Sequence, residues 1–287
     1  MTLYIFNIIM ALLLALPTHN DIHCNTVAQP DDSIAIERML TAAEALGDGE
    51  CRQLFFARQF LGRPYVAHTL EIADPEQLVV NTRQLDCTTL VENVTALTLC
   101  SRRHLTSYHD FLKMLVSLRY RHGKLDGYVS RLHYFSEWID DNSSKGLVRE
   151  QQEPNPPFKA VQTIRLGFMG ANPDKYEILS KHPEFLDDIR LQEQAMTGRK
   201  VKYIPKSMVS NLDAMRKAVD DGDIIAITCN NTGLDIAHVG FAVWRSDGVH
   251  LLHASSVHKK VVEEKSTLSD YLNRRKSFTG VRIIKMN

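Results

Sequence analysis

The apolar residues of this chain change their spacing along the sequence, and that change constrains the fold more than any other feature. Over much of the first half they recur with a helical period, whereas after residue 222 they gather in short runs separated by turns such as Ser246-Asp247-Gly248. Short strands joined by tight turns predict an antiparallel meander. Helices followed by a sheet predict an α+β protein, in which the helices pack on one antiparallel sheet.

Individual elements follow from the same spacing. Helices are expected over residues 33–46 and 50–60, and a strand over residues 78–80 precedes a third helix. The strands of the meander are expected over residues 222–228, 238–244, 249–254 and 280–284. From about residue 104 to residue 215 the pattern is helical and rich in loops. We therefore expect a helical insertion between the third helix and the sheet.

The N-terminus carries an apolar run from Tyr4 to Pro17 that is too short to span a bilayer comfortably. Such a run is typical of the core of a signal peptide, and the small residues Thr26 and Ala28 indicate cleavage after Ala28. We expect a signal peptide over residues 1–28, an exported protein without a stable membrane span after processing, and a single domain over residues 29–287.

Charge and cysteine usage exclude several classes of protein. The 34 basic and 34 acidic side chains balance, whereas a nucleic-acid binder usually carries a basic excess. The densest basic run, residues 199–202, is interpreted as a solvated loop. The five cysteines show neither the spacing of a small disulfide scaffold nor a C-x-x-C zinc pair. We expect no metal or cofactor, the loss of Cys24 with the signal peptide, and mostly buried thiols at Cys51, Cys100 and Cys229, with any pairing among the three left open.

Cys87 is a candidate nucleophile because of its place at the start of the third helix. Asp86 is a good N-cap residue, so Cys87 falls in the first turn of a helix whose apolar face carries Leu90, Val91, Val94 and Leu97. The positive end of the helix dipole favours a thiolate there, and the neighbouring amides could receive an oxyanion. The alternative is an inert buried thiol, which is the commoner state of a cysteine.

Two histidines could supply the base that such a nucleophile needs. His238 opens one strand of a hairpin and His253 lies near the end of the next, so the two can be cross-strand neighbours. Cys87 would attack a carbonyl, His238 would accept its proton, and His253 would fix the tautomer of His238. Either histidine alone would more often be structural, and a zinc site built from the same Cys and His ligands is a second alternative. The other histidines, His250 and His258 among them, are interpreted as surface or structural residues.

The order of these motifs resembles the NlpC-type papain-like cysteine hydrolases of bacterial cell walls. The resemblance rests on Asp86-Cys87, Gly222-Asp223, His238-Val239-Gly240 and Leu252-His253-Ala254-Ser255, and on a closing segment from Leu268 to Arg282. It implies Cys87 as the nucleophile, His238 as the base, His253 as the third member, and Tyr65 as an active-site tyrosine. The chain departs from the family pattern at Thr88-Thr89, where the family has Ser-Gly, and in its long insertion.

Residues 85–93 and 130–135 further resemble a branch described as N-acetylmuramoyl-L-alanine amidase-like, and the likeness covers roughly residues 50–285. This branch implies an enzyme that cuts the amide between the muramic-acid lactyl group and L-Ala, favouring 1,6-anhydro sugar ends. We expect the protein to be a monomer in the periplasm. The expected partner is peptidoglycan or a muropeptide. Nothing in the spacing shows which amide is cut. A γ-D-glutamyl-diamino-acid endopeptidase of the same fold and a non-catalytic muropeptide-binding module therefore stay open as alternatives.

Arginine, histidine and tyrosine are unusually dense in residues 119–121 and 127–135. Arginine forks suit carboxylates and aromatic faces suit sugars, so we expect Arg131, His133 and Tyr134 to line the substrate cleft, with Arg119 a weaker candidate. Replacing Arg131 with Ala should then impair the kinetics without unfolding the protein. Surface helices with long side chains are an equally good interpretation. Beside the nucleophile, the residues expected to contact substrate are Tyr65, Asp86 and Thr88.

Overall fold

The computed structural model describes residues 26–287, so nearly all of the expected signal peptide lies outside it. The helices are α2 (Pro30–Ala43), α3 (Arg52–Gln59), α4 (Cys87–Arg102), α5 (Tyr108–Arg119), α6 (Phe135–Ser144), α7 (Phe168–Ala171), α8 (Glu177–Lys181), α9 (Leu186–Met196), α10 (Leu212–Arg216) and α11 (Leu268–Asn273). The strands are β1 (Thr26–Val27), β2 (Leu78–Val79), β3 (Val148–Gln151), β4 (Ala160–Thr163), β5 (Lys200–Pro205), β6 (Ile224–Cys229), β7 (Ile236–Arg245), β8 (Gly248–Ser255), β9 (Lys260–Glu263) and β10 (Phe278–Met286).

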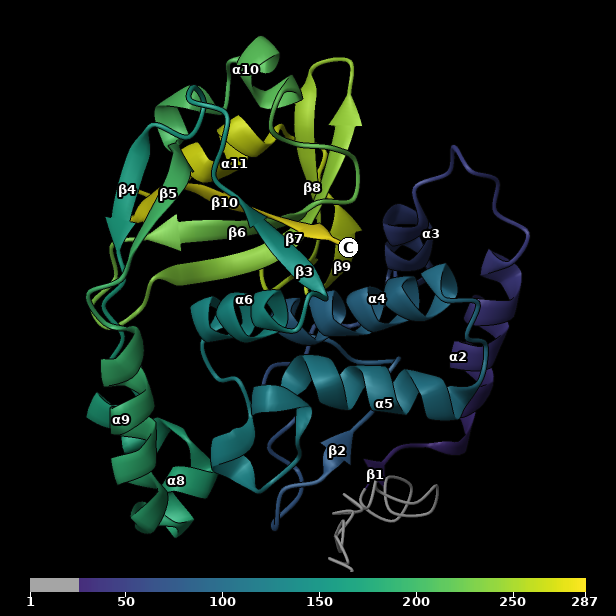
Figure 1. Ribbon diagram of the computed structural model, residues 1–287, viewed down its shortest axis with the longest axis vertical. Coiled ribbons are helices and arrows are strands. Elements are labelled where there is room, and N and C mark those ends of the chain that lie inside the picture. The colour runs from purple at the N-terminus through teal and green to yellow at the C-terminus, as the bar shows by residue number, and fades with distance from the viewer. Residues whose placement is uncertain (1–25) are drawn as a thin grey trace, which may run out of the picture.

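Antiparallel pairing joins most of these strands into one sheet in the order β4-β5-β10-β6-β7-β8-β9, with β3 added alongside β10. The α+β class with an antiparallel meander is confirmed. In Figure 1, α4, α5 and α6 gather below the sheet, whereas α10 and α11 lie above it. Strand β9 was not predicted, because its residues Lys260–Glu263 are half charged and carry no long apolar run.

The insertion differs from the expectation that it is helical, since β3, β4 and β5 all arise within residues 104–215. Lys200, Val201 and Lys202 belong to the basic run that we interpreted as a solvated loop. In the structure they lie in β5 and pair with β4. That interpretation was wrong because alternating Lys and Val also suits a strand near a sheet edge, where charged side chains can reach water.

Helix α4 forms the centre of the lower half of the molecule, and it is buried on almost every side. Its residues Leu90, Val94 and Leu97 share a core with α2, α3 and α5, and with the sheet residues Val239 and Leu252. A second core fills the other face of the sheet beneath α11. The first turn of α4 is thereby held against β7, which presents Cys87 to the start of that strand.

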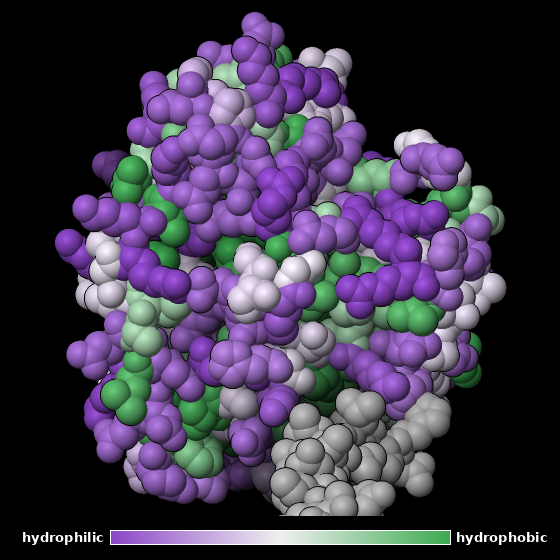
Figure 2. Space-filling view, in the orientation of Figure 1, coloured by the Kyte–Doolittle hydropathy of each residue, from purple (hydrophilic) through white to green (hydrophobic). Residues whose placement is uncertain are grey.

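Three smaller observations concern the N-terminus, the cysteines and the surface. Strand β1 pairs in parallel with β2, so cleavage after Ala28 would remove it, and the cleavage site stays a prediction. Among residues 26–287, the four cysteines are free thiols and no helix is long and apolar enough to cross a membrane. On the face seen in Figure 2, polar side chains dominate and apolar ones form small separate patches.

Candidate active site

Cys87 is the first residue of α4, and a complete capping box fixes the helix start at this position. The Asp86 carboxylate accepts the Thr89 backbone N–H at 2.8 Å, while Thr89 Oγ1 accepts the Asp86 N–H at 2.9 Å. The Cys87 sulfur in turn accepts a hydrogen bond from the backbone N–H of Val239, the residue that follows His238. The thiol therefore lies against the start of β7.

The expected thiolate is a point at which the structure corrects the sequence analysis. Burial, followed by the negative charge of Asp86, raises the pKa of the Cys87 thiol to about 12. Hydrogen bonds from the Val239 N–H and the Thr88 side chain act in the opposite direction but are smaller. Desolvation penalises the charged form more than the helix terminus favours it, so the resting group is a neutral thiol.

His238 and His253 are in direct contact, as the hairpin predicted. The Nε2 atom of His238 lies 2.5 Å from Nδ1 of His253, and the two rings meet edge to face. An irregularity in the pairing of β6 with β7 contributes to this arrangement, because Ile227 pairs with His238 and Thr228 with Ile236, which leaves Ala237 without a partner. Such a bulge re-aims the side chains beside it, and bulges are common next to active sites.

His238, like the Cys87 thiol, is uncharged in the resting protein. Burial, followed by the nearby His253 and Arg275, lowers the pKa of His238 to about 3. His238 is therefore a neutral imidazole in the resting protein, with a lone pair available to accept a proton. A neutral thiol at Cys87 and a neutral imidazole at His238 resemble the resting state of a serine hydrolase more than a preformed ion pair.

Glu264 is a member of this network that the sequence analysis missed. Its Oε1 atom lies 3.2 Å from Nε2 of His253 and 3.1 Å from Nε2 of His258, which we had interpreted as an ordinary surface or structural residue. The hydrogen bond with His253 is the main reason that the pKa of Glu264 is lowered, so it is ionised. The only sequence signal for it is an acidic residue next to β9, and β9 was itself not predicted.

Two tyrosines border the same site. Tyr65 forms a bridge to Leu85 just before α4, and burial together with the charges of Cys87 and Asp86 raises its pKa to about 12. Tyr271 projects from α11 with its ring centroid 6.4 Å from that of His238 and 5.4 Å from that of His253. The structure thus brings Tyr65 beside the nucleophile, as the family resemblance implied, and adds Tyr271.

Asp86 and Thr88 also lie beside Cys87, and both are partly engaged by the helix start. The Asp86 carboxylate bonds both the N–H and the hydroxyl of Thr89. The Thr88 side chain bonds the Cys87 sulfur. These contacts position the nucleophile, and direct contact of either side chain with substrate stays a prediction.

The arginines of the insertion lie in a buried charged cluster. Arg119 bonds Glu92 of α4 at 2.7 Å, and Arg131 bonds Glu71 at 2.6 Å. Arg131 also lies 3.6 Å from Glu76, and only 5% of it is exposed. Truncating it would leave buried carboxylates unpaired, so the expectation that Arg131→Ala spares the fold needs correction.

His133 and Tyr134 have different surroundings from each other. His133 donates through Nε2 to the backbone oxygen of Tyr128 at 3.0 Å, and its ring packs against the ring of Tyr128. Burial, followed by the nearby Arg131, lowers the pKa of His133 well below its usual range. Tyr134 donates to Glu193 of α9 at 2.5 Å and accepts the N–H of Met169. The structure groups His133 with Arg131 around Tyr128, ties Tyr134 to α9, and leaves their role in binding as a prediction.

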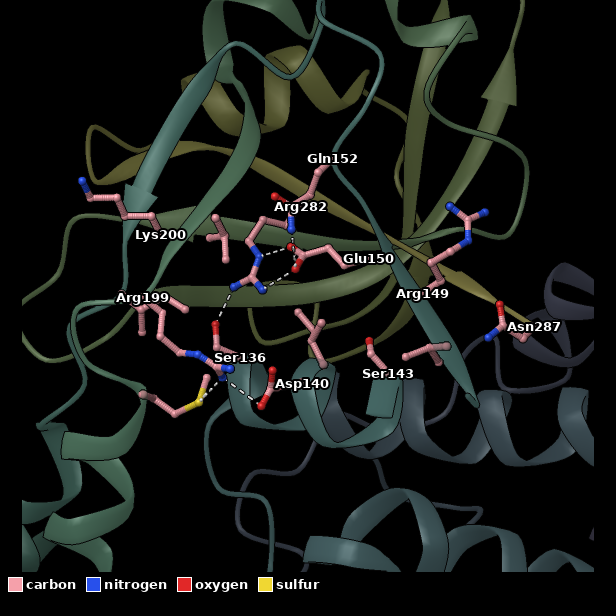
Figure 3. A pocket seen from close by; sticks show the side chains of 15 residues that line it. Ser136, Asp140, Ser143, Arg149, Glu150, Gln152, Arg199, Lys200, Arg282 and Asn287 are labelled. Carbon is pink, nitrogen blue, oxygen red and sulfur yellow. Dashed lines mark hydrogen bonds and ion pairs between the residues drawn. The ribbon is translucent and has the colours of Figure 1, made fainter. Parts of the chain in front are cut away.

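A cavity of about 530 Å³ lies apart from these residues, between α6, β3 and β5 (Figure 3). Arg282 at its floor is held by both carboxylate oxygens of Glu150, at 2.5 and 3.1 Å, and by Ser136. Ser136 also bonds Asp235, which lies in the turn before β7. Cys87, His238 and His253 do not line this cavity. Its polar floor helps to fix the turn that leads to His238.

Among residues 26–287, no group of three or more His, Cys, Asp or Glu side chains is placed to hold a metal ion.

Comparison with known proteins relates this geometry to a family. A family model described as AmiA-like, N-acetylmuramoyl-L-alanine amidase-like, matches residues 55–281. A solved N-acetylmuramoyl-L-alanine amidase from Bacteroides uniformis is 39% identical with a TM-score of 0.76, over 82% of this chain and 98% of that one. A protein from Bacteroides fragilis described as a putative xylanase is also 39% identical with a TM-score of 0.75, over 80% of this chain and 99% of that one.

A protein from Legionella pneumophila shares the fold at 22% identity and a TM-score of 0.69, over 89% of this chain and 94% of that one. None of the curated proteins matches the chain. Because the family model matches well over half of the sequence, and a solved amidase is similar over nearly its whole length, this chain belongs to the AmiA-like family of N-acetylmuramoyl-L-alanine amidase-like proteins.

Proposed function

We propose that this protein is a cysteine-dependent N-acetylmuramoyl-L-alanine amidase with an NlpC-type, papain-like site. Its substrates would be peptidoglycan fragments, with 1,6-anhydro-MurNAc-peptides preferred. The observation that carries the proposal is the hydrogen bond from the Val239 N–H to the Cys87 sulfur, because Val239 directly follows His238, which is neutral and pairs with His253. Family membership supports the amide as the bond that is cleaved.

The residues can perform this reaction in two balanced steps. Cys87 gives its proton to His238 as its sulfur attacks the lactyl carbonyl, and the first-turn N–H groups of α4 face the developing oxyanion. The tetrahedral adduct collapses by breaking its C–N bond, and His238 protonates the leaving amine of L-Ala. A water molecule then gives a proton to His238 as it attacks the thioester. The C–S bond breaks, and His238 returns that proton to the Cys87 sulfur, which leaves the free thiol and the muramic carboxylic acid, whose own proton passes to solvent.

The likeness to a putative xylanase suggests a second candidate, glycoside hydrolysis, which the site supports less well. Most glycosidases use two carboxyl groups that face each other across the scissile bond. Here the Asp86 carboxylate caps α4, and Glu264 lies behind His253 with only 5% of its surface exposed. A thiol and an imidazole suit acyl transfer rather than glycosyl transfer.

The remaining alternatives concern which amide is cut, and whether the protein cuts an amide at all. A γ-D-glutamyl-diamino-acid endopeptidase would use the same three residues, and a binding module would not require them. Export to the periplasm is part of the proposal and is supported by the apolar N-terminal run and by the cell-wall substrate.

Mass spectrometry of anhydro-muropeptides incubated with wild type, Cys87→Ala and Cys51→Ala tests the proposal. Free anhydro-muramic sugar plus intact peptide, formed by wild type and Cys51→Ala but not by Cys87→Ala, is the expected result. Cys51 is a matched control because it also lies at a helix start and is partly buried. Cleavage after D-Glu would instead indicate the endopeptidase, and the absence of cleavage by all three proteins would favour a binding module.

A further inference from the structure

We infer that Glu264 is a positioning residue that sets which nitrogen of each active-site histidine carries the proton. This inference rests on the proposed function, because it concerns how His238 becomes the base for Cys87. It arises from hydrogen-bond geometry around a buried carboxylate that none of the sequence motifs includes.

The backbone of Glu264 is clamped, so its carboxylate has a fixed place. Its N–H donates to the backbone oxygen of Leu251 at 2.9 Å, and its own carbonyl accepts from Nδ1 of His250 at 3.0 Å. His250 is itself buried and held by Asp247 through its other nitrogen. These contacts join the end of β9 to β8, and they direct the Glu264 side chain at His253.

The proton positions follow from the donors and acceptors of the three hydrogen-bonded side chains Glu264, His253 and His238. An ionised carboxylate can only accept, so the Nε2 atom of His253 must carry a proton and donate it to Glu264. A neutral His253 then has a lone pair at Nδ1, and the facing Nε2 atom of His238 must be the donor in the 2.5 Å contact. His238 is neutral, so its Nδ1 is unprotonated and is the nitrogen able to accept the proton of Cys87.

The carboxylate also acts on the charged state that follows. Once His238 takes the proton of Cys87, a positive charge appears beside His253, and the negative charge of Glu264 favours it. The charge of Glu264 already acts on His238 in this direction, against the larger effects of burial and of His253. Without the carboxylate, His253 and His238 would therefore no longer be held in one tautomer each, and the imidazolium form of His238 would be disfavoured.

Other groups share the Glu264 carboxylate and bear on any pH dependence. His258 bonds the same oxygen from the solvent side at 3.1 Å, and Arg274 of the segment after α11 lies 3.9 Å from the second oxygen. Tyr271 and Arg275 lie on the same side of the histidines. His253 is fully buried, whereas the side chain of His258 is nearly half exposed.

The experiment compares Glu264→Gln with the matched control Glu263→Gln. Glu263 is the preceding residue, and its carboxylate pairs with Arg58 and Arg245 at the surface rather than with a histidine. The first readout is the rate at which iodoacetamide alkylates Cys87, followed by peptide mass spectrometry across a range of pH. We expect Glu264→Gln to slow this alkylation near neutral pH by about 10- to 100-fold and to change its pH profile, and Glu263→Gln to leave both unchanged.

The second readout needs no variant, so misfolding of Glu264→Gln cannot obscure the result. In ¹⁵N-histidine NMR spectra of the wild-type protein, we expect both His253 and His238 to carry their proton on Nε2. A proton on Nδ1 of His253, or an alkylation profile that is the same in Glu264→Gln and wild type, would overturn the inference. Both readouts are independent of muropeptide cleavage. A wild type that behaves as described but cuts no muropeptide would refute the proposed function while supporting the role of Glu264.

Discussion

Two cysteines at helix starts, Cys51 before α3 and Cys87 in α4, show what separates a structural thiol from a candidate nucleophile. Both are partly buried free thiols, and burial is the main cause that raises the pKa of each. Both sulfurs accept backbone N–H groups, those of Leu54 and Gln53 at Cys51 and that of Val239 at Cys87. The Cys51 thiol also donates to the backbone oxygen of Asp221 at 3.3 Å.

This contrast indicates that a helix start is not enough to activate a cysteine. A thiol that donates to a carbonyl is stabilised in its protonated form, whereas a sulfur that accepts an N–H is stabilised once it becomes a thiolate. The Cys87 sulfur accepts from Val239, which directly follows His238, whereas the Cys51 proton is directed at a carbonyl that cannot take it. The histidine pair that begins next to Val239, more than the helix start, distinguishes the two sites.

Replacing His238 should separate the two cysteines most strongly. We expect His238→Gln to lower kcat for amide cleavage by about 10²- to 10⁴-fold, because a glutamine side chain cannot accept the proton of the Cys87 thiol. Alkylation of Cys87 by iodoacetamide should slow in the same variant, while alkylation of Cys51 stays at its wild-type rate. Equal slowing of both cysteines would mean that the change acts on the whole fold and not on the Cys87–His238 pair.

The two helices should also differ in how firmly they are anchored. Arg119 of α5 and Glu92 of α4 form an ion pair in which both side chains are about 2% exposed, whereas Arg58 of α3 pairs with Glu263 at the surface. Chemical denaturation should show that Arg119→Ala lowers the free energy of unfolding by about 3–5 kcal/mol, since a buried carboxylate loses its partner. Arg58→Ala should lower it by less than about 1 kcal/mol. Comparable losses would argue against α4 as the rigid support of the nucleophile.

A further expected effect is a pH dependence of stability that comes from His238 at the Cys87 site. The pKa of His238 falls from 6.5 to about 3 on folding, so between these values the unfolded chain binds a proton that the folded protein does not. This contribution to stability is complete above pH 6.5 and is lost as the pH falls towards 3. The free energy of unfolding, measured by chemical denaturation, should therefore fall more steeply over this pH range for wild type than for His238→Gln. Parallel curves would show that His238 is not buried in its neutral form.

Local sequence patterns were sufficient for the elements that form the core of the site. The N-cap at Asp86 and the apolar spacing of residues 90–97 predicted α4 because capping and helical periodicity depend on neighbours within a few residues. The hairpin that brings His238 to His253 was predictable for the same reason, since a tight turn fixes which strands pair. The strands of the insertion were not, because short charged strands depend on the sheet that receives them.

The sequence by itself determined the start of α4 at Cys87, the α+β order of elements and the hairpin that carries the two histidines. Each of these depends on residues that are close together in the chain. Only the tertiary structure decided that Cys87 is a neutral thiol, that Glu264 meets His253, and that Arg131 is buried among carboxylates. The physical reason is that desolvation and long-range hydrogen bonds depend on which surfaces pack together, and spacing along a sequence does not specify this.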